Sequence, residues 1–348
     1  MPAVACYTTQ NSRKNAMRYL DNHDQTDATQ NLALEEYAIR NLLGDEDLLY
    51  FYINAKAIII GRNQNTAEEI ATDVVAAQGI QVVRRVSGGG AVYHDPGNLN
   101  FSFMTRQVNE RFNRYDTFNG PVLAVLHDLG VPAALSGRND ILVEGRKISG
   151  NAQFATADRM LSHGTLLVDS DLDAVTAALR PKPGKVESKG VKSIRSRVAN
   201  INEFLTTPIT AVELRERIIA KIYGTSDRSQ IPTVTLSAED GVGVAALRAS
   251  RYANWDWNYG RNPAANVQRT QRFAAGEVDV RLDIQNNHIA AAAIYGDFMG
   301  QRDVAELAQL LVGVEYSGPA IALALQGIDV GVYVANLTTA EVLTLLAP

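Results

Sequence analysis

The sequence predicts an α+β fold, with helices and strands mixed along the chain, that is divided into two domains. The chain has 348 residues, of which 46% are hydrophobic, so it exceeds one typical domain and can fill two cores. Strand and helix patterns are interspersed up to residue 260, whereas a strictly alternating hairpin pattern follows. We therefore expect a large domain over residues 1–260 and a small α+β domain over residues 261–348.

The large domain is expected to begin with an amphipathic helix over 29–43, which Gly44 ends. Thr66-Ala67-Glu68-Glu69 has the pattern of a capping box, and it predicts a second helix that ends near Gly79. Further helices are expected over 118–129 and 211–223. Short β-rich runs predict strands over 48–53, 57–60, 81–85, 91–93, 99–103, 141–143, 147–154 and 161–168.

The small domain shows a hairpin pattern with no obvious chemistry. Apolar residues alternate with charged ones over 278–284, the chain turns at Asn286-Asn287, and a second strand is expected over 288–295. Because the charged residues Asp279, Arg281 and Asp283 share one face, that face is expected to be exposed to solvent. Helical patterns follow from Val304 and from Thr338.

Composition excludes several classes of protein. A net charge of -5 and a pI near 5.6 argue against a general nucleic-acid binder. The single cysteine, Cys6, excludes an internal disulfide and a multi-cysteine metal site, which fits a reducing compartment. Residues 1–15 lack the apolar core of a signal peptide, and no stretch is long and apolar enough to span a bilayer. We expect a cytoplasmic protein that binds neither nucleic acid nor membrane.

The most informative motif is RRVSGGGAVYH, residues 84–94. Glycines let backbone N–H groups approach a ligand, and arginine offers forked donors for phosphate or carboxylate oxygens. The glycines join two expected strands, whereas a P-loop or dinucleotide fingerprint needs a helix immediately after them. A phosphate or carboxylate site and a flexible turn both remain open for this run alone.

A second motif, GRNDILVEGRKISGNAQ, covers residues 137–153. Lys147 begins a strand whose later residues are small, including Ser149, Gly150 and Ala152, and this leaves room for a ligand beside the backbone. Asp140 precedes that strand and is either a turn-capping carboxylate or a partner for magnesium or ribose. Residues 180–197 then carry seven basic residues and one acidic residue, which indicates a basic loop.

These motifs, followed by HGTLL and PKPGKVESKGVKSIRSRVANI in the same order, resemble the lipoate–protein ligase family. The resemblance spans most of residues 29–260. It implies the fold shared with biotin ligases, a catalytic domain of mixed β-sheets flanked by helices, together with a C-terminal accessory domain. It also implies that the basic loop covers the adenylate.

The family reaction activates lipoate with Mg²⁺-ATP to lipoyl-AMP and passes the lipoyl group to a lysine of a carrier domain. By resemblance, Lys147 is the catalytic residue and Asp140 a candidate magnesium ligand. Arg85 would hold phosphate or carboxylate oxygens, and His94 is either a phosphate donor or structural. The implied ATP or adenylate site consists of Arg85, Gly90, Ala91, Val92, Tyr93, Asp140 and Lys147. The implied lipoate site consists of Arg85, Ser87, Gly88, Gly89, His94, Lys147 and Gly150.

The expected partners are lipoyl carrier domains, namely 2-oxoacid dehydrogenase E2 subunits and the glycine cleavage H protein, and the chain is expected to be a monomer. Three alternatives share the fold. A lipoyl or octanoyl transferase of the thioester type needs a cysteine, but Cys6 lies far from the motifs, so a cysteine-independent transferase is the form of this alternative that stays open. A biotin ligase has a different arginine–glycine pattern. A non-catalytic adenylate-binding relative is disfavoured because Arg85, Asp140 and Lys147 are all present. Lipoate and octanoate are not distinguished.

Overall fold

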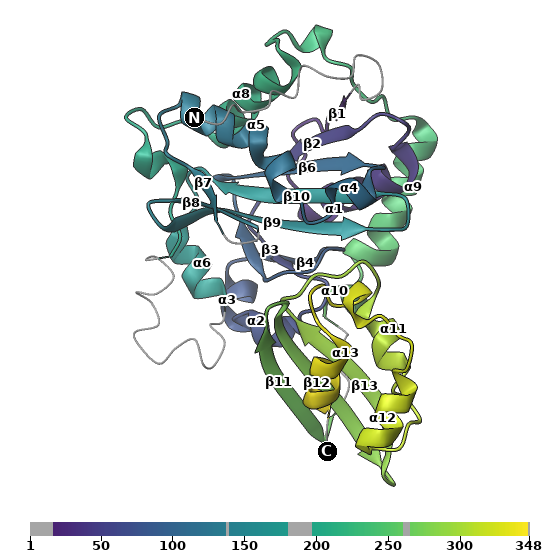
Figure 1. The fold of residues 1–348 in the computed structure, drawn as a ribbon. Coiled ribbons are helices and arrows are strands. Elements are labelled where there is room, and N and C mark those ends of the chain that lie inside the picture. The colour runs from purple at the N-terminus through teal and green to yellow at the C-terminus, as the bar shows by residue number, and fades with distance from the viewer. Residues whose placement is uncertain (1–16, 137–138, 180–196, 260–264, 347–348) are drawn as a thin grey trace, which may run out of the picture.

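The computed structural model describes residues 17–136, 139–179, 197–259 and 265–346. The chain forms a larger core unit, residues 17–259, and a smaller C-terminal unit, residues 265–346 (Figure 1). The expected boundary near Arg261 lies outside the described residues, as do Cys6 and the basic loop up to residue 196. Within the described ranges, no helix combines the length and apolar character needed to cross a membrane.

A seven-stranded sheet forms the centre of the core unit. Strands β1 and β2 are parallel and the other neighbours are antiparallel, so the sheet is mixed as expected. In spatial order its strands are β1 (Arg18–Leu20), β2 (Leu48–Tyr52), β6 (Asn98–Thr105), β10 (Met160–Leu167), β9 (Arg146–Ala155), β8 (Asp140–Val143) and β7 (Ala134–Ser136).

A second, three-stranded sheet has the order β4 (Gln81–Arg84), β3 (Ala57–Ile60) and β5 (Val92–His94). Strand β3 pairs parallel with β4 and antiparallel with β5. The glycine run connects β4 to β5 across the central strand, which confirms that it joins two strands and does not open a helix.

Both faces of the large sheet are buried, because helices cover one face and helices plus the second sheet cover the other. In β2, Leu49 and Phe51 pack in the cluster with α5 (Tyr115–Asp128) and α8 (Ala211–Tyr223). The alternate residues Leu48, Tyr50 and Tyr52 pack with β3, α1 (Ala28–Tyr37) and α9 (Ala238–Leu247). This explains why all five residues of β2 are buried.

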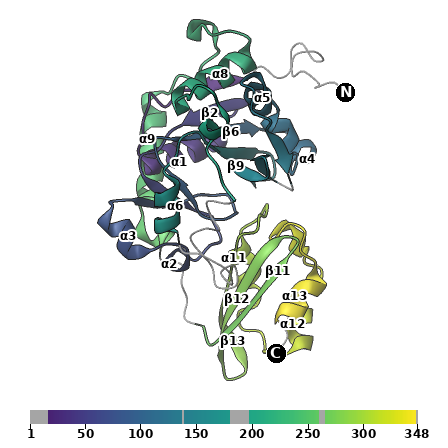
Figure 2. The same cartoon turned by 90° about the vertical axis from the view of Figure 1, so that its left-hand side faces the viewer.

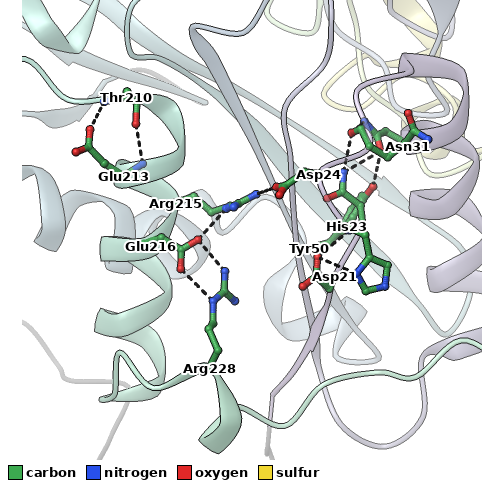
Figure 3. Close-up of polar contacts among 12 residues, drawn as sticks. Asp21, His23, Asp24, Asn31, Tyr50, Thr210, Glu213, Arg215, Glu216 and Arg228 are labelled. Carbon is green, nitrogen blue, oxygen red and sulfur yellow. Dashed lines mark hydrogen bonds and ion pairs between the residues drawn. The ribbon is translucent and has the colours of Figure 1, made fainter.

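Local sequence accounts for the ends of the main helices. Asp27 caps α1, which continues as a π-helical turn, Ala38–Leu42. Thr210 and Glu213 form a capping box at the start of α8, and Gly224 ends that helix at φ +69°. On α8, Arg215 forms ion pairs with Asp24 and with its neighbour Glu216 (Figure 3). The pair with Asp24 links the turn before α1 to this helix.

The predicted helix from Thr66 to Gly79 is wrong, because it is two helices. Helix α2 (Thr66–Glu69) ends at Ile70, which forms a β-bridge with Leu179, and α3 (Thr72–Ala77) follows. The capping box is wrong too. Thr66 is the first helical residue, and its hydroxyl donates to the carbonyl of Asn258 at 2.5 Å. A long-range contact therefore overrides the local cap pattern.

The remaining elements of the core unit are short. Most of them were not predicted, since few apolar positions define their period. They are α4 (Val108–Arg111), α6 (Leu172–Ala178), η2 (Ile201–Phe204), η3 (Arg228–Gln230), the π-helical η4 (Arg248–Tyr252) and α10 (Trp255–Asn258). The strands β1 and β7 were likewise unforeseen.

The C-terminal unit is a three-stranded antiparallel sheet with helices on one side (Figure 2). The predicted hairpin corresponds to β12 (Gly276–Gln285) and β13 (His288–Gly296), and β11 (Val267–Phe273) adds an unforeseen strand. The helical elements are α11 (Val304–Gln309), α12 (Gly318–Ala324), η5 (Val330–Val332) and α13 (Thr339–Leu346).

The prediction that the charged face of this hairpin is exposed to solvent is wrong at Asp279. This carboxylate is 7% exposed and pairs with Arg281 at 2.7 Å, and Arg281 also pairs with Glu68 of α2 at 2.6 Å. The Asp279 carboxylate is satisfied by Arg281 and by Gln268 and Thr270 of β11, and Arg281 links this face to Glu68 of the core unit.

Two glycines of α9 should respond oppositely to the same substitution. Gly241 has open space around its Cβ position, so Gly241→Ala should stabilise the helix by about 0.5–1 kcal/mol. A Cβ on Gly243 would lie 2.4 Å from the Tyr37 ring, so Gly243→Ala should destabilise by about 1–3 kcal/mol. Urea unfolding of both variants measures this difference, and equal effects would contradict the packing of α9 on α1.

Candidate active site

A cavity in the core unit brings the two sequence motifs together. From the first motif it is lined by Arg85, Gly89, Gly90, Ala91, Val92 and His94, and from the second by Asn139, Lys147, Gly150, Asn151 and Ala152. The other lining residues, on α1 and on strands of both sheets, are Leu32, Tyr52, Ile59, Asn100, His163, Gly164 and Thr165. Of the predicted site residues, Ser87, Gly88, Tyr93 and Asp140 are outside this lining.

The Arg85 guanidinium lies beneath the glycine loop, residues 87–90. It donates from Nε to Ser87 Oγ (3.0 Å), from Nη1 to the Ile59 carbonyl (3.0 Å), and from Nη2 to the carbonyls of Gly88 (2.6 Å) and Gly90 (2.9 Å). Burial lowers the pKa of Arg85 to about 10, which still leaves it charged at neutral pH. Four of its five N–H groups donate hydrogen bonds within the protein. A bidentate hydrogen bond to a ligand would therefore require breaking at least one of these bonds.

A buried chain of polar groups continues from the loop to helix α1. Ser87 Oγ lies 2.6 Å from His163 Nε2, and His163 Nδ1 lies 3.0 Å from Glu35 Oε2. Glu35 also accepts hydrogen bonds from the hydroxyls of Ser102 and Tyr52. Burial, reinforced by the Glu35 carboxylate, raises the pKa of Tyr52 well above its ordinary value. The loop is therefore fixed from below by Arg85 and from the side by a Glu–His pair.

Lys147 and Asp140 form an ion pair at the edge of the cavity. Lys147 Nζ is 2.8 Å from Asp140 Oδ1, and both side chains are about one-third exposed. A Cβ on Gly150 would lie only 2.7 Å from Nζ, so the lysine side chain occupies the space that this glycine leaves. The Lys147 N–H donates to the Arg197 carbonyl (2.7 Å), so the end of the basic loop runs beside this lysine.

His94 and Tyr93 point to opposite sides of β5. His94 lines the cavity and is 2% exposed, and Asn54 Nδ2 lies 2.9 Å from its Nδ1. Burial, together with the nearby Arg85, lowers the pKa of His94 to about 3, so the ring is neutral at physiological pH. Tyr93 packs instead in a cluster with Ile58 and Ile60, and burial raises its pKa to about 12.

The C-terminal unit contacts the glycine loop directly, although its sequence had suggested no chemistry. The Gly89 N–H donates to the Phe298 carbonyl (3.3 Å), and a Cβ on Gly88 would lie 2.0 Å from that same oxygen. Nearby, the Tyr115 hydroxyl donates to Met299 Sδ at 2.9 Å. Ion pairing of Arg62 with Asp303 (2.6 Å) adds a charged contact between the units.

The sequence did not identify Glu35 as part of the site, and it left the roles of His163 and Asn100 open. Glu35 is 128 residues from His163 along the chain, and no local spacing links them. The available signal was a pair of acidic residues, Glu35 and Glu36, next to the apolar side of the first helix. Both are 1% exposed, and a carboxylate is buried in this way only when it has partners.

Two family models cover most of the chain. The lipoyl protein ligase A/B catalytic domain matches residues 27–223, and the bacterial lipoate protein ligase C-terminus matches residues 262–346. The lipoate-protein ligase LplJ of Bacillus subtilis is 48% identical over 330 residues, 95% of this chain and 100% of the relative. Lipoate–protein ligase 1 of Staphylococcus aureus is 44% identical, with 95% and 100% covered.

Solved structures share the fold. The Plasmodium falciparum LipL1 complex with lipoate has a TM-score of 0.73 at 24% identity, covering 90% of this chain and 95% of that one. A bipartite lipoate protein ligase with its E2 lipoyl domain from Thermoplasma acidophilum has a TM-score of 0.62 at 30% identity, covering 72% and 98%. Lipoate-protein ligase A bound with ATP has a TM-score of 0.58 at 29% identity, covering 70% and 98%.

The fold and the matched catalytic domain define an enzyme of the lipoyl ligase class. Within that class, the C-terminal match and the near full-length relatives show that the chain belongs to the lipoate–protein ligase family, whose members are ATP-dependent ligases. This confirms the resemblance inferred from the motifs, and the LipL1 comparison supports the expected α+β fold.

The close approach at Gly88 predicts unequal effects of alanine at two neighbouring glycines. Gly88→Ala should push Phe298 away and weaken the Gly89 N–H···O bond, whereas Gly90→Ala meets nothing within 4 Å. We expect the Gly89 amide hydrogen to exchange about 10-fold faster or more in Gly88→Ala, measured by mass spectrometry or NMR. Similar exchange in both variants would refute a tight contact between the loop and the C-terminal unit.

Proposed function

We propose that this chain activates lipoate with ATP to lipoyl-AMP and then transfers the lipoyl group to a specific lysine of a lipoyl carrier domain. The observation that carries the proposal is that the Lys147 ammonium and the glycine loop share one cavity. Relatives named lipoate-protein ligase cover nearly the whole chain, and one structural relative is bound with ATP.

In the first half-reaction a lipoate carboxylate oxygen attacks the α-phosphorus of ATP, and the bond to pyrophosphate breaks. No protein nucleophile is needed, so catalysis depends on position and on stabilising oxygen charge. We assign that role to Lys147, because a compact ammonium can follow charge from the carboxylate to the phosphate. Its pairing with Asp140 and its place over Gly150 support this assignment.

The glycine loop would bind the adenylate through its backbone. The Gly90 carbonyl points to Arg85, and the described peptide bonds include no cis form, so the Ala91 N–H points the opposite way. We propose that Gly90, Ala91 and Val92 contact the nucleotide and that Arg85 adds positive charge beneath them. Tyr93 would contribute through packing. The proposed lipoate-binding site is completed by Ser87, Gly88, Gly89, His94 and Gly150.

Asp140 would hold Mg²⁺ together with ATP phosphates. Magnesium commonly binds one or two carboxylates plus substrate phosphates, so a single partly exposed carboxylate beside the cavity fits. The described residues contain no cluster of three or more acidic, histidine or cysteine ligands that could form a dedicated cage. When bound, the ion would neutralise phosphate charge, while Lys147 remains the protein's own cation at the reacting oxygens.

In the second half-reaction an uncharged lysine amine of the carrier attacks the acyl carbonyl. The mixed anhydride breaks and AMP leaves with the bonding electrons. We propose E2 subunits of 2-oxoacid dehydrogenases and the glycine cleavage H protein as carriers. The relative from Thermoplasma acidophilum, described with its E2 lipoyl domain, supports the first of these. The basic residues of 180–197 suit the adenylate phosphate.

We further propose that residues 1–260 form the catalytic domain and 261–348 the accessory domain. The two separate matches, ending at 223 and beginning at 262, support this division. We also propose that the chain acts as a monomer. The single cysteine fits the reducing cytoplasm, which is the proposed location.

Incubation with lipoate, Mg²⁺-ATP and an apo lipoyl domain should add one lipoyl mass to the acceptor and produce AMP. Mass spectrometry measures the acceptor. Cys6→Ser should leave the rate unchanged, because no thioester step is proposed. A large loss in Cys6→Ser would favour the cysteine-dependent transferase, and binding of adenylate without acyl transfer to any carrier would favour the non-catalytic relative.

Lys147→Ala should slow lipoyl-AMP formation by about 100-fold or more while leaving the unfolding midpoint nearly unchanged, because the side chain is partly exposed. Lys221→Ala is the matched control, since Lys221 is also partly exposed and pairs with Asp128 at 2.7 Å. Lipoate-dependent exchange of pyrophosphate into ATP reports the adenylation step. Full activity of a folded Lys147→Ala protein would remove this lysine from the mechanism.

A further inference from the structure

Three buried asparagines form a hydrogen-bonded chain that ends at His94. Asn22 Nδ2 donates to Asn31 Oδ1 (3.0 Å), and Asn31 Nδ2 donates to Asn54 Oδ1 (2.9 Å). Asn54 Nδ2 then lies 2.9 Å from His94 Nδ1. All four side chains are buried, and Asn31 and Asn54 are fully so. Buried polar groups arranged in series constrain one another's hydrogen-bond roles.

The direction of the chain is fixed by a backbone carbonyl. The Gln25 carbonyl can only accept, and Asn22 Nδ2 (2.9 Å) and Asn31 Nδ2 (2.8 Å) both donate to it. Asn31 Oδ1 also accepts a hydrogen bond from the Tyr50 hydroxyl at 3.1 Å. Figure 3 shows Asn31 on helix α1. The amide orientation of Asn31 is therefore determined by its partners.

The orientation of Asn31 determines the tautomer of His94. Because Asn31 presents Nδ2 to Asn54, the Asn54 atom facing it must be Oδ1, and Asn54 Nδ2 must face the histidine. His94 Nδ1 is then an acceptor and carries no proton. The neutral ring, which the lowered pKa of His94 favours, must hold its single proton on Nε2.

The Nε2–H group is a buried donor of a ring that belongs to the cavity lining. Among the residues that the structure describes, Nε2 has no hydrogen-bond partner, although His94 is 98% buried and lines the cavity. A purely structural buried histidine would be expected to have both nitrogens satisfied, because an orphaned buried donor costs about 1–3 kcal/mol. A ligand bound in the cavity that His94 lines would supply such an acceptor.

We propose that His94 donates its Nε2–H to an anionic oxygen of the bound substrate, and that Asn31 and Asn54 are positioning residues that fix this tautomer. The acceptor is an oxygen of the lipoate carboxylate or of the ATP α-phosphate, the two groups that the adenylation step joins. This inference rests on the proposed function. It adds a neutral directional donor to the cation supplied by Lys147.

The tautomer can be measured without any activity assay. The chain has five histidines, so selective ¹⁵N labelling gives a tractable spectrum, and loss of one signal in His94→Gln assigns this ring. We expect the neutral Nε2–H form between about pH 6 and 8. Asn54→Asp presents a carboxylate to Nδ1 and should place a proton on that nitrogen. An Nδ1–H tautomer in the unmodified protein would overturn the proposal.

Adding lipoate alone and ATP alone distinguishes the two acceptors. A change in the His94 Nε2 signal with lipoate identifies the carboxylate, a change with ATP only identifies the phosphate, and no change with either or with both would overturn the proposal. This binding readout is separate from turnover. If the chain binds and shifts His94 but forms no lipoyl-AMP, the proposed function fails while the assigned donor stands.

Kinetics of two His94 variants test whether the donor matters. His94→Gln keeps an N–H near the Nε2 position and an oxygen near Nδ1 that can accept from Asn54, whereas His94→Phe keeps only the ring shape. We expect His94→Phe to raise the KM of the substrate that shifted the signal by about 10- to 100-fold, and His94→Gln to recover most of it. Equal losses in folded variants would reduce His94 to a packing role.

A matched control addresses stability. Asn119→Asp also converts a fully buried asparagine to an acid, but Asn119 donates to the Tyr115 carbonyl (3.0 Å) in α5 and has no link to His94. It should leave the His94 tautomer unchanged even if it lowers the unfolding midpoint as much as Asn54→Asp does. A changed tautomer in Asn119→Asp would show that general destabilisation, and not the asparagine chain, moves the proton.

Discussion

The arrangement of the cavity depends on burying two adjacent guanidinium groups at the end of β4. Arg84 is 1% exposed and Arg85 6% exposed, and a buried cation is tolerated only when its donors find acceptors. Arg84 donates to the carbonyls of Gly61, Arg62, Gln64 and Trp257 and to Thr66 Oγ1. These bonds hold the β3–α2 connection and α10 against β4, the strand that leads into Arg85 and the glycine loop.

Arg85 applies the same constraint to the glycine loop. The carbonyls of Gly88 and Gly90 turn inward to the guanidinium, so the peptide N–H groups that follow them point outward. One of these, on Gly89, meets Phe298 of the C-terminal unit. The other belongs to Ala91, a residue of the cavity lining. Satisfying one buried cation therefore both orients the peptide groups of the loop and favours the contact between the two units.

The sequence predicted the parts of the site that are contiguous along the chain. Gly90 and Lys147 could be assigned to one site because their motifs resemble those of the lipoate–protein ligase family, and most strands and α8 follow from local periodicity. The Glu35–His163 pair, the asparagine chain to His94 and the Phe298 contact depend on partners far apart in sequence. Neither spacing nor propensity reveals such partners, because tertiary packing alone brings them together. The same reason explains the break at Ile70, where a bridge to Leu179 interrupts a helical pattern.

The three successive glycines differ in what surrounds their missing side chains. Gly88 must lack a Cβ because the Phe298 carbonyl approaches its backbone, and Gly89 adopts φ +91°, which L side chains rarely accept. Neither reason applies to Gly90, which lies in the cavity lining with no neighbour within 4 Å of its Cβ position. Its open side therefore faces space that a ligand can fill. Two of the glycines serve packing and backbone conformation, and the third is the one whose absent side chain leaves open space at the cavity.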